Sequence, residues 1–408
     1  MKILMVNKFF YIKGGSETYY FALRRMLEEL GHTVIDFSME DEKNFPSPYS
    51  SFFVSNIDYN GKLSVGKKLS AAVSLIYSRE AKKNLEALIQ QEQPDIAHLH
   101  IFQRQISLSI LDVLKKHKIP VIYTAHDLQM LCPNYQMLTN GKPCGQCKGG
   151  HYMACAKNRC IKQSLSKSLL GTVEAFYHKL TKRYDIISHI ITPSAFYKEK
   201  FEEFGISPER VTHIPNFLDR SCPGVNPSDE APYYLYLGRL SHEKGIPTLI
   251  QAAQCTGIRL KIVGSGPLYE ELKQQESERI RLLGFKSGQE LTDLVGNAKA
   301  VVLPSEWYEN GPYSAIEALQ LSRPLIGARI GGIPELIREN GFLFESGNTQ
   351  DLCQAILCME ALSPEAYQAA CQASRDLFEA CYTKKVHLLR INQVYQLFGK
   401  DLTCREEM

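Results

Sequence analysis

The chain has 408 residues, more than one domain usually holds, and therefore predicts two domains. Its composition, 44% hydrophobic and 22% charged with a formal net charge of +3, is typical of a soluble globular protein, and we expect no nucleic-acid partner. Twelve cysteines in a chain without a signal peptide indicate reduced thiols or metal ligands rather than a disulfide framework, and no apolar run is long enough to span a bilayer. These features predict a cytoplasmic protein.

Positive charge is concentrated in the first half of the chain. Residues 1–215 contain 28 Lys and Arg against 20 Asp and Glu, a net charge of +8, whereas the remainder has 19 against 24, a net charge of −5. A basic half can contact anionic lipid headgroups at a membrane surface or an acidic acceptor, or it can be an ordinary solvated surface. The charge alone leaves these alternatives open.

The first elements form a strand-helix-strand unit. Residues 2–7 predict a short buried strand, apolar residues at helical spacing predict a helix that ends at Gly31, and residues 33–37 predict the next strand. Gly14 and Gly15 lie between the first strand and the helix, at the edge where such sheets bind ligands, and they let the backbone approach one closely. A simple tight turn is the alternative, and without a G-x-G-x-x-G motif we do not infer NAD.

The next part of the chain continues the same plan. The expected elements are, in order, a loop at 40–65, a helix or broken helix pair at 69–89, a strand at 95–99, a helix at 106–117 and a strand at 121–124. His126 comes directly after that last strand, where open α/β sheets usually carry working residues. The sequence therefore marks His126 as a candidate functional residue.

A cysteine-rich segment, residues 132–160, follows. It contains Cys132, Cys144, Cys147, Cys155 and Cys160. Cys144-x2-Cys147 has the spacing of a structural zinc site, and four thiolates complete a tetrahedron. Because the segment has too few apolar residues for a core, a metal ion would explain its stability. Five cysteines leave the ligand set open; we favour Cys132, Cys144, Cys147 and Cys160, with unliganded thiols or a labile disulfide as alternatives.

Residues 161–184 predict a basic amphipathic helix. Lysines and one arginine are interspersed among apolar residues such as Leu165, Leu169 and Leu180. Such a helix can lie on a membrane surface. Our expectation is instead that it packs its apolar side into the core and presents the charges outward.

The rest of the chain predicts a linker and a second domain of the same kind. The first domain is expected to end at residue 215, after a strand at 186–192, a helix up to 204 and a strand from 211. A proline-rich linker should cover 216–232, the second domain 233–380, and a C-terminal helix 381–408. The expected strands of the second domain lie at 233–238, 261–263, 280–283, 300–303 and 341–344, with the last helices at 349–361, 364–380 and 383–398.

A strand-to-helix loop near the start of the second domain contains two cations. Arg239 and Lys244 lie five positions apart, and the loop should direct both side chains to one place. Two cations beside the start of a helix suit a diphosphate that gains charge as a group leaves it. Exposed surface charges without a ligand are the alternative.

Two carboxylates stand at a second strand-to-helix junction. Glu309 lies in the loop after the strand at 300–303, and Glu317 lies in a helix expected to begin near Tyr313. The start of that helix offers free N–H groups and a positive dipole to a phosphate. Glu317, an acceptor-only group, suits the two hydroxyls of a ribose. Helix capping is the alternative for Glu309.

These motifs together resemble glycosyltransferase family four. Glu309 and Glu317 match the Glu-x7-Glu motif of its retaining members, with Asn-Gly-Pro-Tyr-Ser between them and Glu-Ala-Leu at the end. The Gly238-Arg-Leu…Glu-Lys-Gly run resembles the family's phosphate-binding motif, and the stretch from Thr124 to Asp127 resembles its Thr-x-His-Asp stretch. The resemblance spans most of the chain. It implies the α/β GT-B fold, two Rossmann-like domains facing each other across a cleft, with the C-terminal helix crossing back to the first.

The resemblance also implies roles for individual residues. It implies that His126 points at the transferred sugar, that the Gly14-Gly15 loop contacts the donor diphosphate or the acceptor, and that Phe285 or Lys286 touches the nucleobase. Simple packing is the alternative for Phe285. The predicted catalytic residues are His126, Arg239, Lys244 and Glu309. The predicted donor-binding residues are Gly14, Gly15, Arg239, Lys244, Phe285, Glu309, Gly311, Pro312, Tyr313, Ser314 and Glu317.

We therefore expect a retaining transferase that moves a sugar from a nucleotide-sugar donor to a glycan or lipid-linked acceptor, in bacterial surface polysaccharide synthesis. The sequence has no evident Asp-x-Asp motif, so no catalytic metal is expected, and zinc is expected only as a structural ion of the cysteine segment. A nucleotide-sugar epimerase of the same fold and a non-catalytic cysteine-cluster binding module are the alternatives. A phosphorylase would need a pyridoxal-bearing Lys, and none is identifiable.

Overall fold

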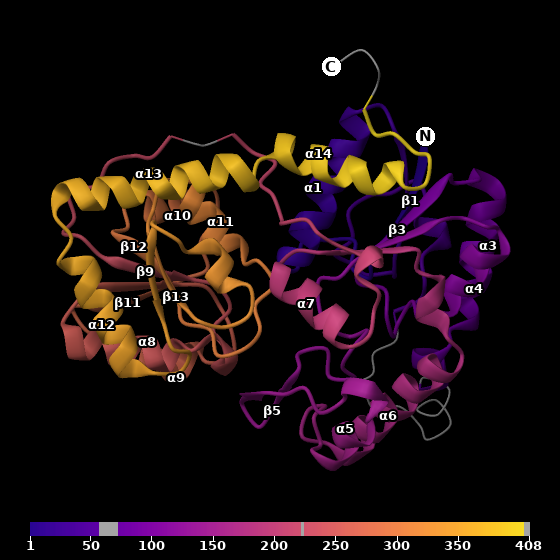
Figure 1. Ribbon diagram of the computed structural model, residues 1–408, viewed down its shortest axis with the longest axis horizontal. Helices are drawn as coiled ribbons and strands as arrows, with labels where there is room; N and C mark the ends of the chain where they lie inside the picture. The colour runs from indigo at the N-terminus through magenta and orange to yellow at the C-terminus, as the bar shows by residue number, and fades with distance from the viewer. Residues whose placement is uncertain (57–71, 222–223, 404–408) are drawn as a thin grey trace.

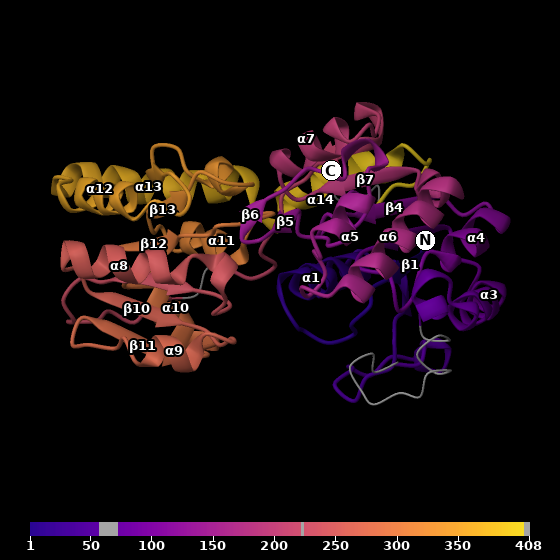
Figure 2. The same ribbon diagram turned by 90° about the horizontal axis from the view of Figure 1, so that it is seen from below.

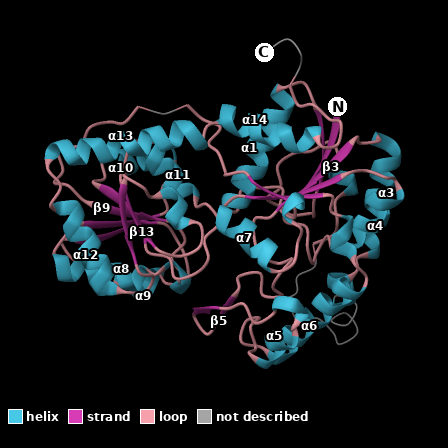
Figure 3. Ribbon diagram, in the orientation of Figure 1, coloured by secondary structure: helices cyan, strands magenta, loops and turns pink. Residues whose placement is uncertain are grey.

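The protein is built around two parallel β-sheets, each covered by helices (Figures 1 and 3). The structure, a computed structural model, describes residues 1–56, 72–221 and 224–403. Residues 57–65 of the predicted loop, the start of the helix predicted at 69, residues 222–223 of the linker and the end of the chain lie outside the described residues. The two layered units confirm the predicted α/β fold of two Rossmann-like domains.

The sheet of the N-terminal domain has six strands in the order β2-β1-β3-β4-β7-β8, and every neighbouring pair is parallel. The strands are β1 (Lys2–Val6), β2 (Thr33–Phe37), β3 (Ile96–Leu99), β4 (Val121–Thr124), β7 (His189–Thr192) and β8 (Val211–His213). The accompanying helices are α1 (Gly15–Glu29), α3 (Arg79–Glu92), α4 (Ser109–Lys116), α5 (Met153–Lys157), α6 (Leu165–Leu180) and α7 (Ala195–Glu203). A small antiparallel ribbon joins β5 (Leu138–Thr139) to β6 (Lys142–Pro143).

The sheet of the C-terminal domain has the order β11-β10-β9-β12-β13-β14 and is also parallel throughout. Its strands are β9 (Tyr234–Leu237), β10 (Leu260–Val263), β11 (Ile280–Gly284), β12 (Ala300–Leu303), β13 (Leu325–Ala328) and β14 (Gly341–Phe344). The helices that follow or cover them are α8 (Ile246–Thr256), α9 (Tyr269–Lys273), α10 (Gly288–Gly296), α11 (Tyr313–Gln320), α12 (Thr349–Glu360) and α13 (Pro364–Cys381).

The strands are short apolar runs because both faces of each sheet are covered. All four residues of β3, β4 and β12 are buried, which is typical of parallel strands between helical layers. In both domains the loops that follow the central strands leave the sheet at its carboxyl edge. The loop after β9 therefore meets the loop after β12, and the loop after β1 lies near that after β4, which brings the predicted site residues of each domain together.

The last helix, α14 (Lys384–Gln396), returns to the N-terminal domain (Figure 1). Its side chains Ile391, Val394 and Tyr395 are buried in one cluster with Ile3 and Met5 of β1. At the crossing point, Leu218 and Thr383 form an isolated parallel β-bridge, so the outgoing and returning chains lie side by side. The second domain is thus inserted between two parts of the first.

The predicted orientation of the helix at 161–184 is wrong. The buried residues of α6 are polar or small, whereas three of its four leucines, Leu165, Leu169 and Leu180, are exposed. Ser164 caps the helix by accepting from the N–H of Lys167, and the Ser168 hydroxyl accepts from the N–H of Ile161. These bonds hold the polar side of the helix inward. The apolar side therefore faces outward together with the charged residues, whereas the prediction placed only the charges outward.

Candidate active site between the two domains

The loop after β9 is pressed against the loop after β12. Gly245 adopts a left-handed conformation with φ of 66°, and a Cβ there would lie 1.8 Å from the carbonyl oxygen of Pro304. Only glycine permits this approach. It places Lys244 beside Glu309, and the ammonium Nζ lies 2.6 Å from the carboxylate Oε1. Arg239, from the same loop, is exposed.

Glu309 is a buried carboxylate held by several partners. It also accepts a hydrogen bond of 2.6 Å from the hydroxyl of Ser305. Burial alone would raise its pKa, but the charge of Lys244 and these hydrogen bonds outweigh burial and hold the pKa of Glu309 below its ordinary value. Its backbone is confined as well, because a Cβ on Gly331 would lie 2.5 Å from its nitrogen, and its carbonyl accepts from the N–H of Gly332. Glu309 is therefore an ionised, rigidly placed group.

The glycine loop of the N-terminal domain reaches the second domain. Gly14 precedes the first turn of α1, and a Cβ on Gly15 would lie 3.3 Å from the ring of Tyr313. Burial lowers the pKa of Lys13, the residue before this loop, and the charge of Arg239 adds to that effect. The structure thus brings the Gly14-Gly15 loop against the start of α11, with α1 and α11 facing each other (Figure 2).

The stretch between the two glutamates begins α11 as predicted. Pro312 lies at the cap position and Tyr313 is the first helical residue. Gly311 has a φ of 75°, and its carbonyl accepts a hydrogen bond of 2.9 Å from the side-chain amide of Asn216. Ser314 follows, half-buried, in the first turn. The helix therefore starts at the interface between the domains.

Glu317 lies one turn inside α11 and faces the linker. Arg220 donates to its Oε1 at 2.7 Å. Burial raises the pKa of Glu317, and Arg220 opposes that effect. Glu317 and Glu309 thus lie on one segment but bind different cations.

His126 is enclosed by aromatic rings at the end of β4. Its Nε2 lies 3.1 Å from Nδ1 of His100, and the two rings stack with centroids 5.4 Å apart. The ring of Tyr19 packs edge-on at 5.2 Å. Burial lowers the pKa of His126 to about 3, so its imidazole is neutral at neutral pH. Asn310, next to Glu309, donates to the carbonyl of Ala125 at 2.9 Å and links this loop to the second domain.

Several interdomain contacts were not predicted from the sequence. Besides its bond to Ala125, Asn310 accepts a hydrogen bond from the hydroxyl of Ser194 at 2.9 Å. Glu335 accepts from the N–H groups of Ala195 and Phe196, at 2.9 and 2.8 Å, and so caps α7 from across the interface. No sequence signal paired Glu335 with α7, because the two lie about 140 positions apart.

Phe285 stands apart from the other predicted donor-binding residues. It follows β11, the outermost strand of the second sheet, and is 74% exposed. The structure does not bring its ring against Glu309 or Lys244 in any contact among the described residues. Its predicted role at a nucleobase stays a prediction.

The thiols of the cysteine segment affect one another in two pairs. The neighbouring Cys147 lowers the pKa of Cys132, and the neighbouring Cys155 lowers the pKa of Cys160. These four cysteines and Cys144 line one small cavity. In the part of the chain that the structure describes, no three His, Cys, Asp or Glu side chains are grouped closely enough to hold a metal ion. The predicted ligand set is therefore not supported by this geometry, and the zinc site stays a prediction.

Comparisons with known proteins match both halves of this arrangement. A family model described as Glycosyltransferase Family 4 matches residues 13–221, and one described as Glycosyl transferases group 1 matches residues 223–375. The chain belongs to glycosyltransferase family 4. This glycosyltransferase also matches the uncharacterized glycosyltransferase MJ1178 of Methanocaldococcus jannaschii, with 23% identity over 97% of this chain and 98% of the relative. It is 26% identical to an uncharacterized 42.6 kDa protein in the cps region of Klebsiella pneumoniae, over 83% of this chain and 88% of the other.

Solved structures support the fold of this family 4 glycosyltransferase. The crystal structure of Anabaena HepE in complex with UDP superposes with a TM-score of 0.67 over 97% of this chain and all of the other, at 17% identity. At that identity the likeness shows the GT-B fold alone. None of the helices in the described ranges 1–56, 72–221 and 224–403 is long and apolar enough to cross a membrane.

Proposed function

We propose that this glycosyltransferase is a retaining enzyme that moves a sugar from a nucleotide-diphosphate sugar to a glycan or lipid-linked acceptor. The single observation that carries the proposal is the contact of 2.6 Å between Lys244 and Glu309, at the carboxyl edge of the second sheet. Arg239 is exposed in the same loop. This combination offers cations for a diphosphate and an ionised carboxylate beside them.

In this proposal the remaining site residues bind different parts of the donor. Glu317 binds the ribose hydroxyls as an acceptor, and the start of α11 contributes free N–H groups to the phosphates. The Gly14-Gly15 loop approaches the diphosphate from the other domain. His126, neutral because burial lowers its pKa to about 3, contacts the transferred sugar by hydrogen bonding rather than as a cation. The HepE complex with UDP supports a nucleotide donor.

The proposed reaction is a front-face displacement. The bond between the anomeric carbon and the phosphate oxygen breaks, the acceptor oxygen bonds to the same face of that carbon, and the acceptor proton passes to the leaving phosphate. Arg239 and Lys244 stabilise the charge that develops on the phosphate, which is where electrostatic catalysis is strongest. Because these two cations supply the charge, we propose that no catalytic metal is required.

The proposed setting is the cytoplasm, in bacterial surface polysaccharide synthesis. The Klebsiella relative in the cps region supports this setting. All ten cysteines that the structure describes are free thiols, which fits a reducing compartment. Contact with an anionic membrane surface belongs to the proposal, because the first half of the chain carries a net charge of +8 and lipid-linked acceptors lie at such a surface.

Donor screening without an acceptor tests the proposal. The purified chain, incubated with a panel of nucleotide sugars, should slowly release nucleoside diphosphate from one of them, and chelation of divalent ions should leave the rate unchanged. Lys244→Ala should lose this hydrolysis, whereas Lys273→Ala, a lysine of an exposed ion pair in the same domain, should keep it. Saturable nucleoside-diphosphate binding without turnover of any donor would favour a binding module, and interconversion of the donor sugar would favour an epimerase.

A further inference from the structure

Helix α6 presents its apolar residues to solvent. Leu165, Leu169, Val173 and Leu180 are 54%, 48%, 48% and 80% exposed. With about 100° of rotation per residue, the four side chains fall within an arc of about 80° on one side of the helix. Met153 of the adjoining helix α5 is 58% exposed as well. We call these five residues the α6 face.

The opposite side of α6 is polar and buried. Ser168, Thr172, Glu174 and His178 are all buried, although a helix that packs on a core normally buries its leucines. The Thr172 hydroxyl donates to the carbonyls of Ser168 and Tyr152, which ties α6 to the segment before α5. Hydrogen bonds therefore hold the helix with Leu165, Leu169 and Leu180 outward.

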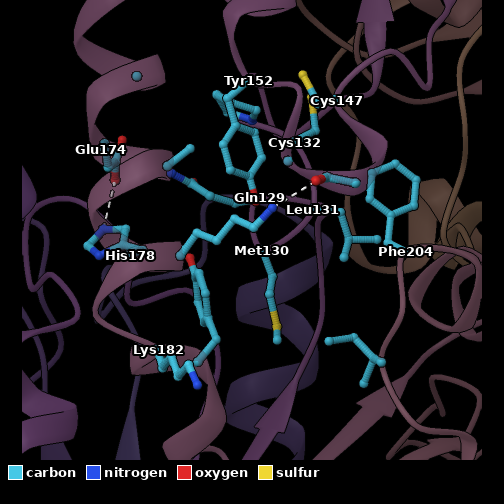
Figure 4. Close-up of a pocket in the computed structure, with 18 of the residues that line it drawn as sticks. Gln129, Met130, Leu131, Cys132, Cys147, Tyr152, Glu174, His178, Lys182 and Phe204 are labelled. Carbon is cyan, nitrogen blue, oxygen red and sulfur yellow. Dashed lines mark hydrogen bonds and ion pairs between the residues drawn. The ribbon is translucent and has the colours of Figure 1, made fainter.

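A cavity explains why the inner side is polar. Glu174 and His178 line a cavity of about 380 Å³ between α6 and the segment from Gln129 to Pro133, and their side chains lie toward each other, 3.8 Å apart (Figure 4). His178 is 3% exposed, and neither ring nitrogen has a hydrogen-bond partner in the described structure. The segment on the other wall comes directly after His126. The inner side of α6 thus faces this cavity, and its outer side is left for another contact.

The charge around the α6 face is strongly positive. Residues 142–183 contain nine Lys and Arg and a single acidic residue, the buried Glu174. Lys157, Lys167, Lys179 and Lys182 are exposed on and beside the two helices. Helices α5 and α6 also form the lower edge of the N-terminal domain, at a distance from the second domain (Figure 1). An apolar stripe flanked by lysines at an open edge matches an anionic lipid surface in both chemistry and charge.

We propose that the α6 face docks on an anionic lipid bilayer. The leucines insert at the level of the headgroups, and the lysines contact the phosphates around them. This inference rests on the membrane contact of the proposed function and assigns that contact to one surface; vesicle binding tests the surface, whereas donor hydrolysis tests the transferase. Docking by this face would bring the loop that carries His126 near the bilayer.

Vesicle sedimentation tests the docking. The purified full chain should sediment with vesicles of phosphatidylcholine and phosphatidylglycerol and should stay in solution with phosphatidylcholine alone. Combined Leu165→Ser, Leu169→Ser and Leu180→Ser substitutions should weaken binding about ten-fold or more, because each removes apolar area from the contact. Lys167→Glu with Lys182→Glu should weaken it further and reduce its salt dependence.

A matched variant controls for loss of leucines as such. Leu357, Leu389 and Leu397 are 48%, 57% and 63% exposed but lie outside α5 and α6, so their change to serine should leave vesicle binding intact. Melting temperature and donor hydrolysis should be unchanged in both triple variants. Equal binding by the two variants, or no binding by the wild-type chain, overturns the proposal. A dimer of the wild-type chain that becomes monomeric in the α6 variant, without vesicle binding, would make the face a contact between copies instead.

Discussion

Arg239 and Lys244 share a loop but have different surroundings. Lys244 is paired with the buried Glu309, whereas Arg239 is exposed. We predict that Arg239→Ala and Lys244→Ala each lower kcat/KM. The decrease should correspond to a loss of about 2–4 kcal/mol of transition-state stabilisation, as expected for removal of one charge-stabilising group. Steady-state kinetics on the donor found by screening measures both. Near-normal turnover in the two variants would end the diphosphate assignment.

Substitution of the two glutamates of the Glu-x7-Glu motif should affect different steps of the reaction. Glu317 lies in α11 and Glu309 in the loop beside Lys244, so Glu317→Ala should mainly weaken nucleotide affinity and Glu309→Ala should mainly lower turnover. Calorimetric titration with nucleoside diphosphate, together with kcat, separates the two effects. Equal loss of binding in both variants, with unchanged residual turnover, would contradict this division.

His126 belongs to the first domain and should not affect nucleotide binding on the second. His126→Ala should leave the calorimetric isotherm for nucleoside diphosphate intact while sugar transfer falls. His189→Gln is the control, because that histidine also belongs to the first domain but is buried and hydrogen-bonds Thr212 on the neighbouring strand. A lost isotherm in folded His126→Ala protein would show that the residue is structural.

At the scale of elements, the cysteine segment offers a sharp test. If four thiolates saturate a tetrahedral ion, protein purified without chelators should carry about one zinc per chain. Cys147→Ser should lose the metal, whereas Cys255→Ser, an exposed cysteine of the second domain, should keep it. Chelation should loosen residues 132–160 and weaken acceptor handling more than nucleotide binding. Protein with neither zinc nor iron and with five freely titrating thiols here would refute the site.

Elements with a single strong pattern were predictable from the sequence. The apolar runs at 121–124, 300–303 and 341–344 became β4, β12 and β14 with the expected bounds, and α11 begins at Tyr313. The orientation of α6 was not predictable, because periodicity defines an apolar side without saying whether that side meets the core. Hydrogen bonds of Ser168 and Thr172 settle it, and their partners, Ile161 and Tyr152, lie outside the helix.

Across the whole molecule, buried histidines link stability to pH. Burial lowers the pKa of His98, His126 and His387 to about 3. Between that value and the ordinary pKa of about 6.5 the unfolded chain binds more protons than the native one, so stability falls as pH decreases through this window. Each histidine should cost about 2 kcal/mol at pH 5 relative to pH 7.

Chemical denaturation at a series of pH values measures this linkage. The slope of the unfolding free energy against pH gives the number of protons taken up on unfolding. In His98→Gln this number should be smaller by about one, whatever the substitution does to stability at pH 7. An unfolding free energy that stays constant between pH 7 and pH 5 would contradict the buried, neutral state of these rings.

The contacts between the two domains are the part of the candidate site that the sequence did not predict. The sequence predicts which residues lie on each strand-to-helix loop. It also predicts that these loops meet within a domain, because they leave a parallel sheet at the same edge. The bonds that join the domains were not predicted: Asn310 to Ala125, and Glu335 to the start of α7, connect residues well over a hundred positions apart. Such pairings depend on how two finished sheets meet, which local pattern does not encode.

The return of α14 has a consequence for how the protein is made. The cluster that contains Ile3 and Met5 also contains Tyr395 and Leu402, all fully buried, and the Leu402 carbonyl bonds the ring of His32. A ribosome must therefore nearly finish the chain before the first domain can close this cluster, whereas the last residue in the core cluster of the second domain is Tyr382. Synthesis runs from N- to C-terminus, yet the half that emerges first is the half completed last.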